Sequence, residues 1–378
     1  MTHRVPCLLA VLASGLALAP CANAQSSNDA PVAYAYVSTP LAVDGFAVAA
    51  NGRLTPLPGS PFVGLAFTHM SVNSKYLFGA GQDGVNVYSY AMAADGSLSP
   101  ADVVPARTYY DCEKLYGTQV DRTGSTLYLS QSGCTGGNDF NIQSYKISSS
   151  GTLQFLGNTL DDEPSQAPPS PLYFLANNKY AYQVACTTVP SYEGFLGGFE
   201  RDSTGYLNFH STEFDYPDFA SHFCLNFLAT DDFNNAAVEL LAYNCCYTFD
   251  QAKIASFSAD ANGDMSSANG FNVRTLSLQD GEVSAMSISP SGKLLAVGGP
   301  HGFQLFHFNG AAPPGYYSQV LQPNNQFEEF GWDKSDHLFA LSTDGLRVYN
   351  ITPSAYSEAP GSPLEIPGAS SVIVVSLQ

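Results

Sequence analysis

Leu127-Tyr128-Leu129-Ser130 is a short apolar segment typical of a β-strand, and segments of the same kind recur along this chain of 378 residues. Seven copies share an aromatic or aliphatic centre, at residues 34–38, 76–79, 127–130, 180–183, 238–243, 294–297 and 338–341. Successive copies are 42 to 59 residues apart when they are measured between central residues. Repeats of this length are typical of the four-stranded blades of a β-propeller.

Each copy is followed by a second segment with alternating side chains, and in five copies a turn containing glycine comes next. The glycines of these turns are Gly52, Gly96, Gly151, Gly205 and Gly263. Glycine suits a hairpin turn because it adopts a positive φ without a steric penalty. We therefore expect each copy to form a hairpin that leads into an outer strand.

The strand that closes the ring is expected at the C-terminus. Six copies are preceded by an apolar segment that fits an innermost strand, at residues 67–72, 115–120, 172–175, 225–228, 283–288 and 327–332. The first copy has none, whereas Ser371-Val372-Ile373-Val374-Val375-Ser376 belongs to no other blade. Lending this strand to the first blade would remove exposed sheet edges. The sequence thus predicts an all-β fold: residues 25–378 form a single seven-bladed propeller of four-stranded blades, in which the C-terminal strand joins the N-terminal blade.

Residues 1–24 have the features of a signal peptide. Arg4 supplies a positive charge, an apolar core too short to span a bilayer follows, and Ala22-Asn23-Ala24 provides small residues for cleavage. No later segment has the about 18 consecutive apolar residues of a transmembrane helix. We expect an exported protein, periplasmic or extracellular, whose mature chain begins at Gln25.

The charge of the chain limits its partners. There are 14 Lys and Arg residues against 33 Asp and Glu residues, which gives a formal net charge of −19. Such a protein repels phosphate backbones and anionic lipid surfaces, so nucleic acid is excluded as an expected partner.

The cysteines predict disulfides. Cys7 and Cys21 lie in the signal segment, and six others remain: Cys112, Cys134, Cys186, Cys224, Cys245 and Cys246. An even number outside the cytoplasm favours disulfides, while a zinc site lacks both a C-x-x-C motif and a suitably spaced pair of histidines. Cys112 begins an innermost strand and Cys134 ends the strand beside it, which predicts a Cys112–Cys134 bridge.

Two pairings stay open for the other four cysteines. In the first, Cys224 pairs with Cys245 or Cys246, and Cys186 takes the one that remains. In the second, Cys245 pairs with Cys246, and Cys186 with Cys224.

Two turn-to-strand phrases carry a family resemblance. Ser289-Pro290-Ser291-Gly292-Lys293-Leu294 and Asp121-Arg122-Thr123-Gly124-Ser125-Thr126 resemble the blades of seven-bladed lactonase-type propellers. That family includes bacterial 6-phosphogluconolactonase-like proteins and surface proteins with Tyr-Val-Thr-Asn repeats. Its innermost strands carry a channel-facing histidine in a Pro-x-His or Pro-Arg-His pattern, and His69 occupies the matching place. The resemblance covers nearly the whole mature chain and implies the propeller fold and a lactone hydrolase.

Acidic and histidine residues gather where the innermost strands begin, which is one mouth of the expected channel. We take His69, His222 and Glu329 as candidate catalytic residues, and Asp111, Glu113, Glu282, Glu328 and Tyr110 as candidate ligand-binding residues. The same carboxylates could hold a divalent cation such as calcium. Adjacent side chains of a strand point to opposite faces, so at most one of Glu328 and Glu329 faces the channel. The alternative is that these polar residues only fill a hydrated channel.

Three functions are compatible with these sequence features. The first is binding of a small ligand, a carbohydrate or a protein partner at one mouth of the channel. The alternative is an enzyme that hydrolyses an uncharged lactone, and the second alternative is a structural protein of the cell envelope. The motifs G-x-S-x-G and H-E-x-x-H are absent, which excludes the common serine hydrolases and zinc proteases.

Peptide mapping of the secreted protein without reduction should recover Cys112 and Cys134 in one linked fragment. The bridges are expected because the compartment is oxidising. Recovery of six free thiols would contradict the whole scheme, and a fragment linking Cys186 to Cys224 would select the second pairing.

Overall fold

The computed structural model describes residues 30–81, 84, 86–106, 114–132, 140–161, 170–187, 193–210, 223–242, 252–267, 273–278 and 283–377. The described residues form β-strands joined by turns, with no helix among them. None of them therefore forms an apolar helix of the length that a bilayer requires. Pro31–Gln378 makes up one unit.

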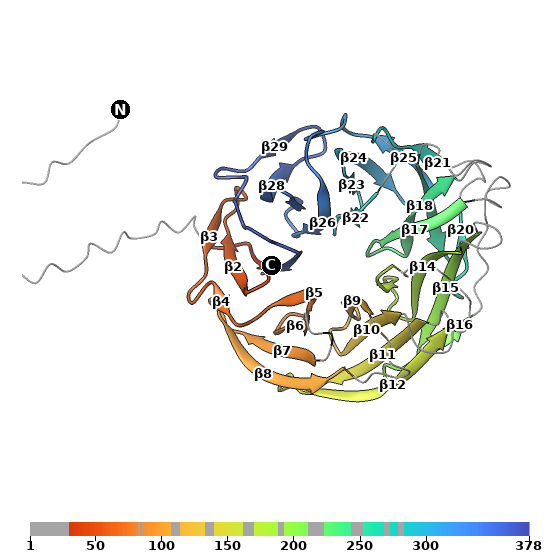
Figure 1. The fold of residues 1–378 in the computed structure, drawn as a ribbon. Helices are drawn as coiled ribbons and strands as arrows, with labels where there is room; N and C mark the ends of the chain where they lie inside the picture. The colour runs from red at the N-terminus through yellow and green to blue at the C-terminus, as the bar shows by residue number, and fades with distance from the viewer. Residues whose placement is uncertain are drawn as a thin grey trace, which may run out of the picture. The chain divides into compact units, whose positions relative to one another are not determined.

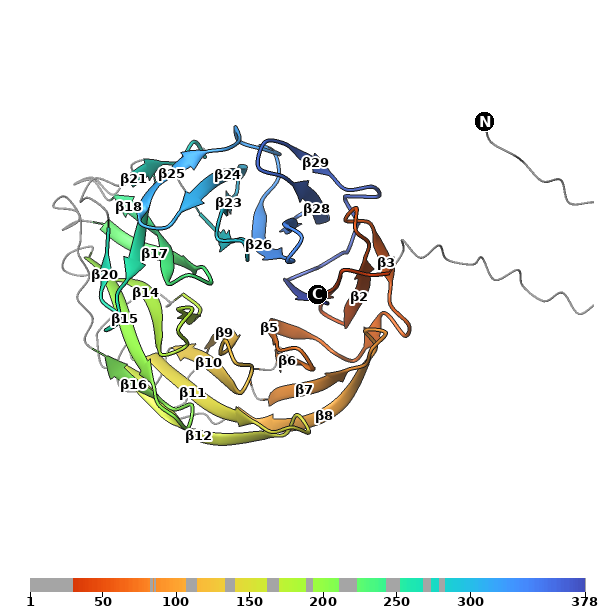
Figure 2. The ribbon, with the colours of Figure 1, turned by 180° about the vertical axis from the view of Figure 1, so that it is seen from behind.

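Seven antiparallel sheets are arranged in a ring around a central axis as the blades of a propeller (Figure 1; Figure 2 shows the ring from behind). In each blade the strands are given from the innermost outward. Blade 1 contains β30 (Ser371–Ser376), β1 (Ala33–Ser38), β2 (Ala42–Val48), β3 (Leu54–Pro56) and β4 (Phe62–Val63), and blade 2 contains β5 (Phe67–Val72), β6 (Tyr76–Gly81), β7 (Asn86–Met92) and β8 (Leu98–Pro105). Blade 3 contains β9 (Lys114–Val120), β10 (Thr126–Ser132), β11 (Phe140–Ile147) and β12 (Leu153–Asp161), and blade 4 contains β13 (Tyr173–Phe174), β14 (Tyr180–Thr187), β15 (Glu193–Arg201) and β16 (Leu207–His210). Blade 5 contains β17 (Phe223–Thr230), β18 (Asn235–Ala242), β19 (Lys253–Ala259), β20 (Met265–Ser266) and β21 (Val273–Thr275). Blade 6 contains β22 (Ala285–Ile288), β23 (Leu294–Gly299), β24 (Gly302–Asn309) and β25 (Ala312–Tyr316). Blade 7 contains β26 (Phe327–Trp332), β27 (His337–Ser342), β28 (Gly345–Ile351) and β29 (Tyr356–Glu358).

Blades 1 and 5 have an outermost strand in two pieces. β3 and β4 both pair with β2, and β20 and β21 both pair with β19. Each blade therefore keeps four strand positions, and the predicted all-β, seven-bladed fold is confirmed.

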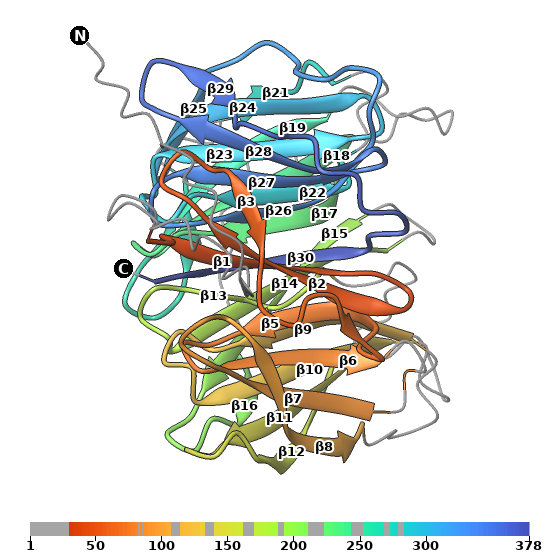
Figure 3. The same ribbon diagram turned by 90° about the vertical axis from the view of Figure 1, so that its left-hand side faces the viewer.

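The ring closes through the C-terminal strand. β30 pairs antiparallel with β1 over six residues, from Ala33 opposite Ser376 to Ser38 opposite Ser371. Figure 3 shows the two strands lying side by side although they come from opposite ends of the chain. The predicted completion of the first blade is confirmed.

Apolar side chains pack between neighbouring blades. Seven buried clusters are present among the described residues, and each one joins a different pair of adjacent blades. Between blades 3 and 4, for example, the rings of Tyr128 and Phe174 lie with their centroids 5.1 Å apart. The core of this protein is therefore divided among the interfaces, because a single sheet covers neither of its own faces.

A tyrosine hydroxyl links each of the first four blades to the next. The second strand of a blade carries the tyrosine, and the hairpin turn of the following blade supplies the carbonyl acceptor. The bonds run from Tyr36 to Gly96 (2.7 Å), from Tyr76 to Ser149 (2.8 Å), from Tyr128 to Gly205 (2.6 Å) and from Tyr182 to Gly263. Burial raises the pKa of Tyr36 and of Tyr128, so these phenols remain protonated donors.

The five predicted hairpin glycines all have a positive φ, between 78° and 99°. Gly151 shows why a side chain is excluded there. A Cβ atom on Gly151 would lie 2.4 Å from Cε1 of Tyr76, the residue that bonds to the same turn. Glycine is therefore required at position 151 for two reasons. It adopts the positive φ of the turn, and it leaves room for the aromatic ring of Tyr76 from the preceding blade.

Gly151→Ala should destabilise the protein by about 2 to 5 kcal/mol, the sum of left-handed strain and overpacking against Tyr76. Gly64→Ala is the matched control, because Gly64 has a φ of 84° and a Cβ added to it would meet no atom within 4 Å. The control should lose only the about 1 to 2 kcal/mol of backbone strain. Equal denaturation midpoints for the two variants would show that the contact with Tyr76 is unimportant.

Candidate functional site at one end of the channel

His69 and Glu329 occupy equivalent positions on the innermost strands of blades 2 and 7. A β-bulge interrupts the pairing of β5 between Phe67 and His69, and the same irregularity interrupts β26 between Phe327 and Glu329. After the bulge, His69 lies opposite Ala80 and Glu329 lies opposite Leu341, each the fifth residue of the second strand. Bulges redirect side chains locally, and here they do so in two blades at the same depth.

Glu329 is held at the start of β30. The backbone N–H of Val372 donates a hydrogen bond of 2.5 Å to Oε2 of Glu329, and the Ser371 hydroxyl makes a second bond to this carboxyl. The pKa of Glu329 is raised to about 7, mainly by burial and also by the neighbouring Glu328, while the two hydrogen bonds oppose this rise. Near neutral pH this carboxyl can therefore either donate or accept a proton.

Glu328 has a different environment from Glu329. It is the extra residue of the β26 bulge, and its side chain is exposed to solvent. Glu329 is only partly exposed. The bulge thus separates the two adjacent carboxylates.

His69 lies on the other side of β30. The Ser38 hydroxyl bonds to both the N–H and the carbonyl of Phe67, at 2.9 Å each, and Ser38 is the β1 residue opposite Ser371. His69 and Glu329 therefore flank the same end of β30 from its two sides. Burial lowers the pKa of His69, partly offset by a hydrogen bond with the backbone of Leu115, so the imidazole is neutral at pH 7.

Tyr173 is a channel residue that sequence reasoning missed. It belongs to β13 of blade 4, yet the charge of Glu329 in blade 7 adds to the burial that raises the pKa of its phenol. The phenol and the carboxyl therefore interact electrostatically across the channel. Tyr173 could have been predicted as a candidate, because it combines an aromatic ring with a polar hydroxyl and lies in a segment expected to be an innermost strand.

The remaining candidates cannot be placed in this cluster. Tyr110, Asp111, Glu113, His222 and Glu282 lie outside the described residues. So do Cys112, Cys134, Cys245 and Cys246, as well as the side chains of Cys186 and Cys224. Within the described ranges, no three His, Cys, Asp or Glu residues are grouped closely enough to hold a metal ion. The calcium site and the disulfides therefore stay predictions.

Glu329→Gln should change how stability depends on pH. The carboxyl has a pKa of about 7 in the folded protein against an ordinary 4.5, so the folded state binds its proton more tightly. Its contribution to stability is full below about pH 4.5 and is lost as the pH rises through 7, by at most about 3 kcal/mol.

The variant should therefore gain stability relative to the parent as the pH rises from 4 to 8, measured by urea unfolding. Glu328→Gln, which removes the neighbouring exposed carboxylate, should show no comparable gain. Parallel curves for parent and Glu329→Gln would contradict the raised pKa.

The comparisons with known proteins concern the fold. No protein-family model matches the chain, and no curated protein matches its sequence. A solved structure of a protein from Lactobacillus plantarum is similar with a TM-score of 0.64 and 12% identity, over 91% of this chain and 99% of that one. Two candidate 6-phosphogluconolactonases are also similar at 14% identity. The protein from Bacteroides uniformis has a TM-score of 0.63 over 91% of this chain and 99% of its own. For the protein from Bacteroides fragilis the TM-score is 0.58, over 93% and 100%. The chain thus has the seven-bladed propeller fold of 6-phosphogluconolactonase-like proteins.

Proposed function

We propose that this protein binds a small uncharged polar ligand at the end of the channel formed by His69, Tyr173 and Glu329. The observation that carries the proposal is the environment of Glu329. This carboxyl is hydrogen-bonded to Val372 and Ser371, its charge adds to the burial that raises the pKa of the Tyr173 phenol from another blade, and its own pKa is about 7. A few fixed polar groups of this kind orient the ligand in a small-molecule site.

The protonation states favour a ligand without charge. His69 and Tyr173 are neutral at pH 7, and Glu329 is divided between its two forms. Together they offer donors and acceptors with little fixed charge, which suits the hydroxyl and carbonyl groups of a carbohydrate or a lactone. The net charge of −19 also opposes the approach of anions.

A second candidate function is hydrolysis of an uncharged lactone, favoured by the pKa of Glu329. A carboxylate with this pKa can remove a proton from water as the water oxygen bonds to the carbonyl carbon. Cleavage of the ring C–O bond then releases an alkoxide, which takes back a proton, and the products are a carboxylic acid and an alcohol. The fold shared with candidate 6-phosphogluconolactonases supports this reaction class as an analogy.

The proposal places the protein outside the cytoplasm. Its support is the signal-like segment at residues 1–24 and the six cysteines beyond it. A protein partner or a structural role in the envelope is the alternative that applies if no small molecule binds.

The test is a pH-stat assay with uncharged lactones, run beside a thermal-shift screen with the same lactones and with oligosaccharides. Acid release should fall by about a hundredfold or more in Glu329→Gln, the usual effect of losing a general base. Its rate should rise as the pH passes through 7. Glu328→Gln is the matched control and should keep its rate.

A thermal shift without acid release would support binding alone. Absence of both signals would contradict the proposal. Turnover that persists in Glu329→Gln would remove this residue from the reaction.

A further inference from the structure

A cavity lies toward the end of the channel where the innermost strand of several blades turns into the second strand. It has a volume of about 250 Å³ and is lined from blades 1, 3, 5, 6 and 7. Along β26 it is lined by Phe330, Gly331 and Trp332, the last three residues of the strand, and not by Glu329. The cavity therefore shares no residue with the site proposed above, although the two adjoin along β26.

Arg122 is fixed in this cavity by acceptors from two other blades. Its Nη2 donates to the carbonyls of Phe174 and Asp231, both at 2.9 Å, and to the Thr230 hydroxyl at 3.2 Å. Its Nη1 forms an ion pair with Asp232. Since the guanidinium is already immobilised, a ligand would lose little additional entropy in ordering it.

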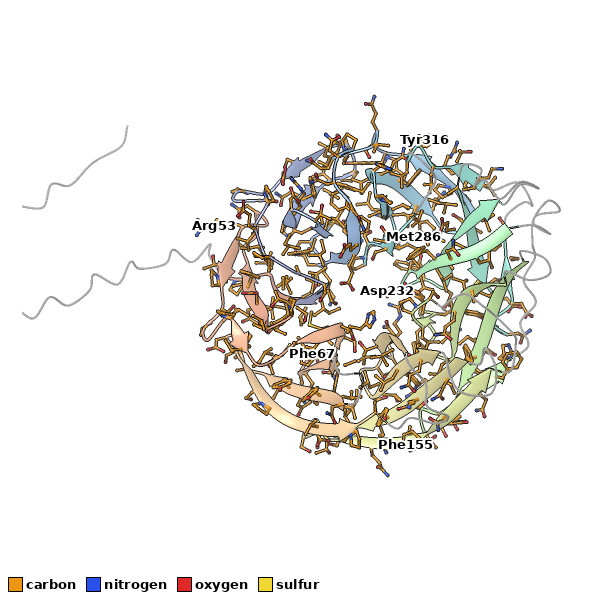
Figure 4. All side chains as sticks on the ribbon, viewed as in Figure 1. Arg53, Phe67, Phe155, Asp232, Met286 and Tyr316 are labelled. Atoms are coloured by element: carbon orange, nitrogen blue, oxygen red, sulfur yellow. The ribbon has the colours of Figure 1, made fainter. Side chains whose placement is uncertain are left out.

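The ion pair keeps access to solvent. The side chain of Arg122 is 32% exposed and that of Asp232 is 52% exposed. Figure 4 shows Asp232 at the inner rim of the ring. The pair thus presents both a donor and an acceptor toward the channel while its two charges cancel.

Part of the lining is apolar. Trp332, which is only 8% exposed, contributes to it together with Phe330, Ile373 and Val374. Ser287 is a further polar residue of the lining, whereas the hydroxyl of Ser289 is buried and bonded within its own turn. A second carboxylate of the lining, that of Asp231, is buried and accepts hydrogen bonds from the N–H groups of Phe233 and Asn235. Apolar side chains beside one accessible ion pair match the chemistry of a sugar ring, which has C–H faces and a rim of hydroxyls.

We infer that this turn-side cavity is a second binding site, for a single uncharged sugar ring. A charged ligand would have to break the Arg122–Asp232 pair, whereas sugar hydroxyls can bond to both partners without separating them. The volume of about 250 Å³ lies below the range of drug-sized pockets, which also favours a small ring. The inference does not depend on the function proposed for the His69 end.

Trp332 provides the readout, because it is the only tryptophan of the chain and lines the cavity. Its fluorescence, excited selectively, is titrated with methyl glycosides of glucose, galactose and mannose. At least one of them should change the emission in a saturable way. Asp232→Asn should weaken that binding about tenfold or more, because a charged acceptor is lost.

Matched variants separate this site from other effects. Asp95→Asn makes the same substitution at an exposed hairpin turn of blade 2 and should leave the titration unchanged. Ser287→Phe should fill the cavity and abolish the signal, with circular dichroism and the melting temperature checking its fold.

Four results would overturn the inference. One is the absence of a saturable change with every glycoside. The second is equal loss in Asp232→Asn and Asp95→Asn, and the third is a response to glycine or sulfate in place of the glycosides. The fourth is loss of binding in Glu329→Gln with retention in Asp232→Asn, which would assign the sugar to the other end of the channel.

Discussion

The pairing of β30 with β1 is the constraint on which the rest of this structure depends. A blade is a sheet with two apolar faces, and each face is covered only by the adjacent blade. The seven buried clusters therefore exist only when all seven interfaces do. Six residues at the C-terminus supply the innermost strand of the first blade and so bring blades 7 and 1 together. They also supply Ser371 and Val372, which bind Glu329, so closure of the ring builds part of the candidate site.

The strands could be predicted from the repeats, whereas the positions of the site residues depend on β-bulges that the repeats do not reveal. Residues 67–72, 327–332 and 371–376 were expected as innermost strands, and β5, β26 and β30 have these bounds. The hairpin turns could be predicted because their backbone has a positive φ, which glycine adopts without a steric penalty. The bulges in β5 and β26 could not be predicted, because a single extra residue changes the alternation of polar and apolar side chains too little to be recognised in the sequence.

Residues of the channel escaped prediction for a second reason. Tyr173 belongs to a strand of two residues, too short to show which of its side chains faces inward. Arg122 lies in a turn, and its partners Phe174, Asp231 and Asp232 are more than 50 residues away along the chain. Both residues matter through contacts between blades. Such contacts depend on how the blades are arranged around the ring, which a single repeat does not encode.

The tyrosine bonds between blades give the ring a direction. In each of the first four links, the earlier blade in the chain donates and the later one accepts. These four donors are therefore all synthesised before their acceptors. Blade 1 differs from the others, because its innermost strand, β30, is synthesised after all the other strands. Until then the growing protein is an open arc with an incomplete sheet at its leading end, and the final residues convert it into a ring.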